Sequence, residues 1–504
     1  MSQVTVAVEG TTSHSRSRIG RRLLAVVALV IVADWLFYWR TPGISITLFF
    51  LALAAASIAV NEAVAPRWQV FAASTVLLLG LLPTVLKPDL VSTLFGGLGT
   101  AFFVLAMNGK AGRGWADNIR RPLALLGGMV WRFAPGLARL ARFWARSRQG
   151  RGYRRALLTW IVPLLVGGLF LFLFYSANPL IAAWIKALDI LNILHTMSSG
   201  RPVFWLCFLA IAWPFVFLHV GRKRIEVRAL VPALSKVEHP LFGKDAIFKS
   251  LVLFNALFAV QTILDLFYLW GGVKLPAGTD YASYAHEGAY TLMLTAILAA
   301  AFVLAAMRRG SESSRSVWVR RLVYLWTLQN VVLVCSSMLR LDLYVRAYAL
   351  TYWRVAALIW MLLVAVGLVL IMARIALDRG NRWLIGMNLA SLALVLYLCS
   401  LANFPMLIAS YNIAHAAERP AGSASLDVEY LAELGPWALP AIDRYLADSA
   451  ARHRRRLAAE RDRLAARHVE EQEDWRAWSF YDWRLSRYLA RNSRYENVPL
   501  GLRR

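Results

Sequence analysis

The chain alternates between long apolar runs and short polar segments, and the runs are too long for the core of a water-soluble domain. A helix that crosses a bilayer needs about 20 mainly apolar residues. Eleven runs approach that length, and each predicts a membrane-spanning helix. These predicted spans cover 22–39, 43–60, 68–86, 91–107, 156–175, 202–220, 248–269, 290–307, 322–339, 355–373 and 383–403. The pattern predicts an all-α, polytopic α-helical integral membrane protein with about 11 transmembrane helices.

The composition supports this prediction, since 59% of the residues are hydrophobic, 17% are charged and the mean hydropathy is +0.52. Soluble domains are roughly half apolar and a quarter charged. The three cysteines exclude a disulfide scaffold, and all of them fall inside predicted spans, where they serve as small packing residues.

The net charge of +27 raises the question of a nucleic-acid partner, and the position of the charge answers it. If the N-terminus is cytoplasmic, the cytoplasmic segments hold 32 Lys and Arg, the opposite loops hold eight, and the other 16 follow the last span. This alternation is the positive-inside pattern of membrane proteins. We therefore expect no nucleic-acid partner. The run after Arg22 ends in Tyr38-Trp39-Arg40 without a cleavage site, which predicts an uncleaved first span.

The spans and charges predict six parts of the chain. These are a cytoplasmic N-terminal segment (1–21), a four-helix N-terminal membrane part (22–107), a cytoplasmic basic amphipathic region (108–155), a seven-helix membrane core (156–403), a linker (404–425) and a small helical C-terminal domain (426–504). An odd number of spans puts that last domain on the outer side. In it, Gly435-Pro436 predicts the end of one helix and the start of the next.

The basic amphipathic region repeats arginine on one helical face, with aromatic residues on the rest. Such a helix lies among lipid head groups, so we expect anionic lipid as a partner at the cytoplasmic face. A twelfth span broken at Pro135 is the alternative, and Arg132 near its middle disfavours it. On the outer side, the stripe from Leu180 to Leu194 predicts an interfacial helix that carries Asp189 and His195.

Ionisable and polar side chains gather at the outer ends of several spans. The candidate outer-face polar cluster is Asp265, Tyr281, Tyr284, His286, Glu287, Arg340 and Asp342. Three further candidates are intramembrane amides: Gln261, Gln329 and Asn330. A carboxylate in a bilayer is costly, so such residues indicate a substrate or ion pathway by default.

A structural role remains open for every member of this cluster. Asp265 lies near enough to the end of its span to reach head groups, and interhelical hydrogen bonds alone would explain the amides. Arg340 and Asp342 would then form a local salt bridge, and the tyrosines an interfacial belt. His286 is the strongest functional candidate because its charge switches near neutral pH.

The motifs that would identify a known chemistry are absent from the sequence. There is no nucleotide-binding glycine loop, Cys-x-x-Cys pair or nucleophile elbow. His286-Glu287 begins like a zinc-protease helix, but Tyr290 stands where the second histidine belongs. We therefore expect no cofactor and no metal site, and no catalytic residue is assigned.

Several segments resemble an uncharacterised bacterial membrane family. They are Asp265-Leu-Phe-Tyr-Leu-Trp-Gly-Gly272, Tyr281-Ala-Ser-Tyr-Ala-His-Glu-Gly-Ala-Tyr290, Tyr411-Asn412, Leu426-Asp-Val-Glu-Tyr-Leu-Ala-Glu-Leu-Gly435 and Asp474-Trp-Arg-Ala-Trp478. Together they are similar to domain of unknown function 4173, which has 4153 as a relative, over roughly 156–490. The resemblance implies a multi-pass protein of the bacterial inner membrane and cell envelope, with no assigned chemistry.

Three hypotheses about function remain. The first is a carrier with an outward-facing site for a small molecule or lipid head group. The second is a membrane-embedded enzyme that modifies the envelope, and the third is a non-catalytic scaffold with a protein partner on its C-terminal helices. We favour the outward-facing site used for transport.

Overall fold

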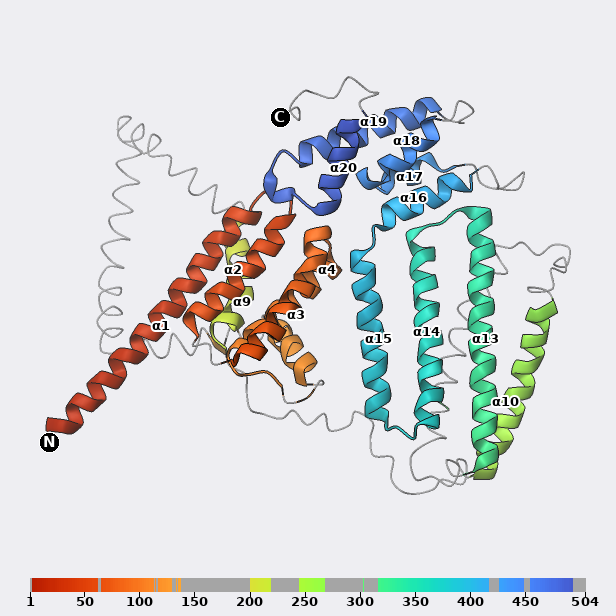
Figure 1. Ribbon diagram of the computed structural model, residues 1–504, viewed down its shortest axis with the longest axis horizontal. Helices are drawn as coiled ribbons and strands as arrows, with labels where there is room; N and C mark the ends of the chain where they lie inside the picture. The colour runs from red at the N-terminus through yellow and green to blue at the C-terminus, as the bar shows by residue number, and fades with distance from the viewer. Residues whose placement is uncertain are drawn as a thin grey trace, which may run out of the picture. The chain divides into compact units, whose positions relative to one another are not determined.

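The computed structural model describes the chain in segments, with side chains from Ile19 onward. The described segments are 2–61, 65–112, 114, 117–128, 133, 135–136, 200–218, 244–267, 302, 316–416, 426–447 and 454–492. Every regular element in these segments is a helix, as predicted (Figure 1). The chain forms two compact units, Met1–Arg222 with Glu471–Phe480, and Lys223–Glu470 with Tyr481–Arg504.

In the described part of the first unit there are five long helices. They are α1 (Ser2–Phe37), α2 (Ile44–Val60), α3 (Arg67–Leu86), α4 (Leu90–Met107) and α9 (Arg201–Val216). Leu53, Val104 and Phe215 from three of them are fully buried in one apolar core. Helices α3 and α4 pack very closely, because a Cβ on Gly80 would lie 2.8 Å from the carbonyl oxygen of Phe95.

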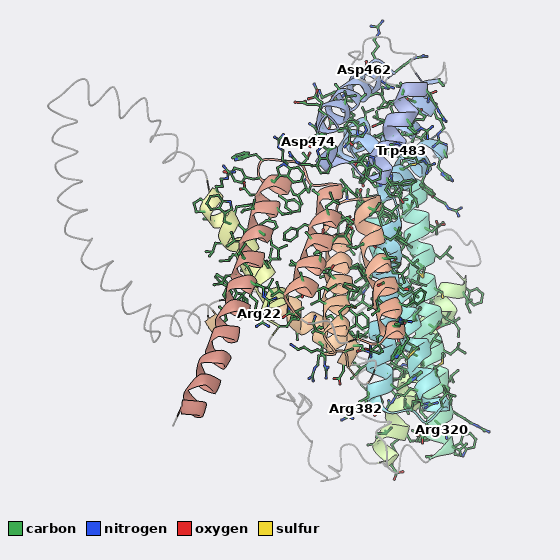
Figure 2. All side chains as sticks on the ribbon, turned by 60° about the vertical axis from the view of Figure 1, so that its left-hand side comes forward. Arg22, Arg320, Arg382, Asp462, Asp474 and Trp483 are labelled. Carbon is green, nitrogen blue, oxygen red and sulfur yellow. The ribbon has the colours of Figure 1, made fainter. Side chains whose placement is uncertain are left out.

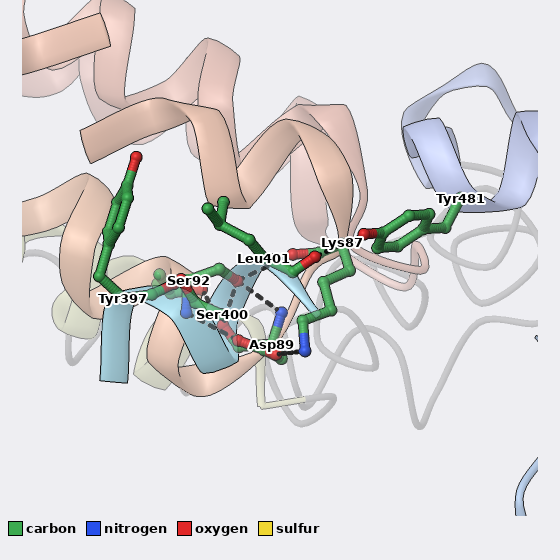
Figure 3. A network of polar contacts seen from close by, with 8 residues as sticks. Lys87, Asp89, Ser92, Tyr397, Ser400, Leu401 and Tyr481 are labelled. Atoms are coloured by element: carbon green, nitrogen blue, oxygen red, sulfur yellow. Dashed lines mark hydrogen bonds and ion pairs between the residues drawn. The ribbon is translucent and has the colours of Figure 1, made fainter. Parts of the chain in front are cut away.

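The start of α4 shows why the chain turns sharply between α3 and α4. Asp89 caps the helix by accepting from the backbone N–H of Ser92 at 2.7 Å, and the Ser92 hydroxyl accepts from the backbone N–H of Asp89 at 2.9 Å (Figure 3). This capping box satisfies two N–H groups that a helix start leaves without partners. Lys87 pairs with Asp89 at 2.9 Å.

Among its described residues, the second unit has four helices long enough to cross a membrane. They are α10 (Lys244–Asp265), α13 (Val317–Tyr348), α14 (Tyr352–Ala376) and α15 (Asn381–Leu401). Helices α13, α14 and α15 run up and down beside one another, and α10 packs on α13 (Figure 1). With α3 and α4, six described helices have the length and hydropathy of membrane spans.

The remaining predicted spans are short or lie outside these segments. Helices α2 and α9, predicted as spans 43–60 and 202–220, are apolar but shorter. The first predicted span is the second half of α1. Spans 156–175 and 290–307, apart from Phe302, lie outside the described residues, as do Asp189, His195 and most of the basic amphipathic region.

The C-terminal residues of the second unit are helical, as predicted. They form α16 (Phe404–Ala414), α17 (Val428–Glu433), η3 (Pro436–Ala438), α18 (Leu439–Ala447), α19 (Arg454–Glu471) and α20 (Phe480–Arg491). Gly435 lies at φ +80° between α17 and η3, so the predicted stop and start are confirmed. Residues 404–414, predicted as linker, instead form α16, because Ile408 and Asn412 are buried against the α13–α14 turn.

Candidate functional site

Asp265 and Arg340 form a buried ion pair between α10 and α13. The guanidinium Nη2 of Arg340 donates to Oδ1 of Asp265. Asp265 is 1% exposed and Arg340 is 7% exposed, so neither charge reaches solvent around the bundle. Two of the seven residues in the predicted outer-face cluster are thus brought together from positions 75 residues apart.

Gln261 completes this polar contact from the same helix as the acid. It lies one turn before Asp265 on α10 and donates its amide to the same carboxylate oxygen at 3.0 Å. The i to i+4 spacing puts both side chains on one helical face, as the sequence predicts. One oxygen of Asp265 therefore receives two donors, while Oδ2 has no hydrogen-bond partner among the described residues.

Arg340 lies within the helical bundle and not at its outer end. The sequence predicts a span that ends at residue 339, whereas α13 continues to Tyr348. At 1.5 Å per residue, Arg340 lies about 12 Å before the end of the helix. The pair is buried, although Asp265 is the last residue of α10.

Asp342 does not take part in this contact. It pairs with Arg346 at 2.9 Å, one turn along α13, and both side chains are exposed. The local salt bridge considered between Arg340 and Asp342 is therefore wrong. Residues two apart on a helix do not face each other.

A second polar contact joins α10 to α13 about 15 Å from the ion pair by helical rise. Asn255 donates to the carbonyl oxygen of Leu322 at 3.1 Å, and Gln329 donates to the backbone oxygen of Asn255 at 3.3 Å. The neighbouring candidate Asn330 is 2% exposed and bonds the carbonyl oxygen of Trp326 on its own helix at 2.8 Å. Asn255 lies within the predicted span 248–269 and is not among the candidate site residues.

The aromatic packing beside Asn255 could not be found from the sequence. Trp326 stacks on Phe254 with ring centroids 5.3 Å apart and meets Phe258 and Phe302 edge-on, both at 5.7 Å. These four residues come from three apolar runs, in which nothing marks the aromatic of one run as the partner of an aromatic in another.

Four members of the predicted cluster lie outside the described residues, namely Tyr281, Tyr284, His286 and Glu287. Their proximity to Asp265 stays a prediction. Within the described segments, no group of three or more His, Cys, Asp or Glu is arranged to hold a metal ion.

The C-terminal helices hold a separate polar network. Arg461 is 2% exposed and pairs with Asp443 at 2.8 Å, and the hydroxyl of Tyr488 donates to the same carboxylate at 3.1 Å. Burial, followed by the charge of Asp443, raises the pKa of Tyr488 to about 12. These contacts join α18, α19 and α20 and have a structural role.

Together these features define an all-helical protein whose helices are long and apolar enough to cross a membrane, with charged and amide side chains buried between two of them. The model of a family described as a domain of unknown function, DUF4153, matches residues 23–445. The chain belongs to that family, which the sequence resemblance had named as a relative. No curated protein and no solved structure matches the chain.

Proposed function

We propose that the protein is a multi-pass carrier of the bacterial inner membrane with an outward-opening site for a small molecule or lipid head group. The observation that carries this proposal is the buried pair Asp265–Arg340. Moving two charges out of water costs several kcal/mol per ion, and well-packed apolar residues in their place are often neutral or stabilising. Buried pairs inside membrane bundles typically mark substrate or ion pathways. A role in a substrate or ion pathway therefore explains the buried pair better than a contribution to folding stability does.

The charge distribution supports eleven spans with the N-terminus in the cytoplasm. In the second unit, Arg320 and Arg382 lie at one end of the long helices, and Asp462 and Trp483 lie at the other (Figure 2). In the first unit, Arg22 precedes the apolar half of α1, whereas Asp474 pairs with Arg40 after its end. Basic ends face the cytoplasm, where anionic lipid is the expected partner, so the C-terminal helices lie outside.

The test compares envelope lipids and exported metabolites in a deletion strain complemented with single variants. Asp265→Asn and Arg340→Gln each leave one buried charge without its counterion, and we expect transport of the affected compound to fall at least about tenfold, equivalent to 1.4 kcal/mol. His286→Ala is tested in parallel because the sequence ranks it first.

Asp342→Asn is the matched control, since it removes an exposed carboxylate from the same helix and should restore transport. Membrane yield and a single gel-filtration peak show that each variant folds. Full restoration by both folded pair variants contradicts the proposal. A missing product, in place of a substrate held in the wrong compartment, favours the envelope-modifying enzyme.

A scaffold function is the second candidate, favoured by the contact between the C-terminal segment and the first helices. Arg476 lies over the ring of Trp35 at 4.7 Å, and the backbone N–H of Ile44 donates to the carbonyl oxygen of Trp478 at 2.7 Å. The exposed faces of α19 and α20 remain for a protein partner. If residues from Leu426 onward, anchored to an unrelated span, restore the phenotype alone, the scaffold replaces the carrier.

A further inference from the structure

Three buried oxygen atoms along the contact between α10 and α13 have no hydrogen-bond donor among the described residues. They are Oδ1 of Asn255, Oε1 of Gln329 and Oδ2 of Asp265. Asn255 is 7% exposed and Asp265 is 1% exposed, so the lipid side of the bundle does not reach them. We name this set of three side chains the acceptor seam.

The neighbouring carbonyl groups fix which amide atom is left over. The amide nitrogen of Asn255 donates to Leu251 at 2.7 Å and to Leu322 at 3.1 Å, and that of Gln329 donates to the backbone oxygen of Asn255 at 3.3 Å. Turning either amide over would place its oxygen against a carbonyl oxygen. The side-chain oxygens are therefore the atoms without partners, and all three accept and cannot donate.

Unsatisfied acceptors are expensive inside a membrane. Water does not reach the hydrocarbon core to compensate them, and each costs several kcal/mol. Nearly all buried polar groups in proteins have a partner, so three acceptors without a donor among the described residues need an explanation. A species that carries positive charge toward oxygen would satisfy all of them.

The charge of the acceptor seam indicates whether a monovalent or a divalent cation would bind there. Among the described residues, the carboxylate of Asp265 is neutralised by Arg340, so these residues supply no net negative charge to offset a divalent ion. A monovalent cation adds one charge only, and carbonyl and carboxylate oxygens are its usual ligands in carriers.

We propose that the acceptor seam binds a monovalent cation, either an alkali-metal ion or an ammonium-type ion, which is the coupling ion of the carrier proposed above. The inference rests on that proposed function. The amides of Asn255 and Gln329, which we call the inner position, lie about 15 Å from Asp265 along the helices. The two groups therefore form two successive binding positions on one path, with Asp265 as the outer position. At the outer position the cation approaches the Oδ2 atom that Arg340 and Gln261 leave open.

The experiment measures equilibrium binding to the purified full chain in detergent at constant ionic strength, with no transport substrate. The probes are ²²Na⁺, ⁸⁶Rb⁺ in place of K⁺, and ¹⁴C-methylammonium, which distinguish the sources of the cation. We expect saturable binding of one probe and an affinity at least about tenfold lower in the double variant Asn255→Leu/Gln329→Leu, which corresponds to 1.4 kcal/mol.

Asn388→Leu is the matched control. Among the described residues, the Asn388 amide on α15 bonds only its own helix, at the carbonyl oxygen of Leu384, and its loss should leave binding unchanged. If the amides of Asn255 and Gln329 had a structural role only, the double variant would still bind the cation and would differ from the wild type only in thermal stability.

No saturable binding of any probe, or equal binding by the wild type and the double variant, overturns the inference. So does a chain that dissipates a pH gradient in proteoliposomes without binding any of the three cations, since the seam would then conduct protons through water. These results leave the proposed carrier intact if Asp265→Asn still abolishes transport. Saturable binding with unimpaired transport in Asp265→Asn would instead contradict the carrier alone.

Discussion

In the C-terminal helices, a buried histidine links two helices through polar contacts. Nε2 of His468 on α19 lies 3.0 Å from the hydroxyl of Ser486, and Nδ1 lies 4.0 Å from Asp482, which accepts from the indole of Trp437 at 2.7 Å. His468 is 2% exposed. Burial lowers the pKa of His468 below its ordinary 6.5, although the charge of Asp482 opposes the shift.

This shift predicts that acid weakens the packing of α19 against α20. The unfolded chain binds a proton on this histidine more readily than the folded chain does, so stability is complete above pH 7 and falls as pH drops through 6.5. The slope can reach about 1.4 kcal/mol per pH unit until the folded histidine also protonates. Amide hydrogen exchange of α19 and α20 in the full chain, corrected for the intrinsic rate, measures it.

The variants His468→Gln and His415→Gln separate this effect from general acid sensitivity. Replacing His468 should flatten the dependence between pH 7.5 and 5.5, whereas replacing His415, on the α16 side, should leave it as in the wild type. The same slope in all three chains would contradict the assignment to His468.

The residues of the candidate site could be predicted one by one, but their pairing could not. A polar residue in an apolar run is visible in the sequence, which is how Asp265, Gln261 and Arg340 were found. The contact between Asp265 and Arg340 depends on which helices pack together, and no local pattern encodes that. By contrast, the pair Asp342–Arg346 has the i to i+4 spacing of a helix and could have been predicted.

At the scale of elements, the turn between α1 and α2 is shaped to receive the segment that contains η4 (Trp475–Ala477). A Cβ built on Gly43 would lie 2.2 Å from the carbonyl carbon of Ala477, which is backbone and cannot move aside alone. Trp35 and Trp475 pack with centroids 5.6 Å apart, and Arg40 pairs with Asp474 at 3.2 Å. Only glycine allows this approach.

Gly43→Val should detach the segment from the turn, at a cost of about 1–3 kcal/mol for forcing atoms into a packed contact. A disulfide formed between cysteines at positions 40 and 474 measures the contact, and its yield should fall in the variant. Gly127→Ala is the control, because nothing lies within 4 Å of its added Cβ. An unchanged yield in Gly43→Val would show that the turn tolerates a side chain.

The ends of helices could be predicted where an apolar run meets polar residues. They could not be predicted where the helix forms because its residues are buried against other helices. Helices α3 and α4 begin and end within a residue or two of the predicted spans 68–86 and 91–107. Helix α16 lies in the segment predicted as linker, whose Pro, Gly and Ser residues all fall later, in 418–425, apart from Pro405 and Ser410. Asn412 in fact bonds both backbone groups of Leu350, at 2.6 and 2.9 Å, and so stabilises the α13–α14 turn. The hydroxyl of Tyr481 similarly donates to the carbonyl oxygen at the end of α15, Leu401, at 2.5 Å (Figure 3).

At the scale of the whole molecule, topology is the property that the proposed function depends on. In each unit taken by itself, the C-terminal residues pack at turns that the charge pattern assigns to the outer side, 38–43 and 349–351. The predicted topology would therefore put the C-terminal residues of both units on the outer side.

Alkaline-phosphatase fusions test this side directly. Fusions after Lys274 and after Ser425 should be active, and fusions after Arg113 and after Arg315 should be inactive, because the enzyme folds only outside the cytoplasm. An inactive fusion after Ser425 would mean that the number of spans is wrong by one, most simply around Arg132.

The contact of residues 471–480 with the α1–α2 turn also has a consequence for biosynthesis. The ribosome makes Gly43 more than 430 residues before Ala477, yet each completes the packing of the other. The packing at the α1–α2 turn is therefore completed only after the far end of the chain has been synthesised. A chain that ends before Trp475 would lack the aromatic packing partner of Trp35.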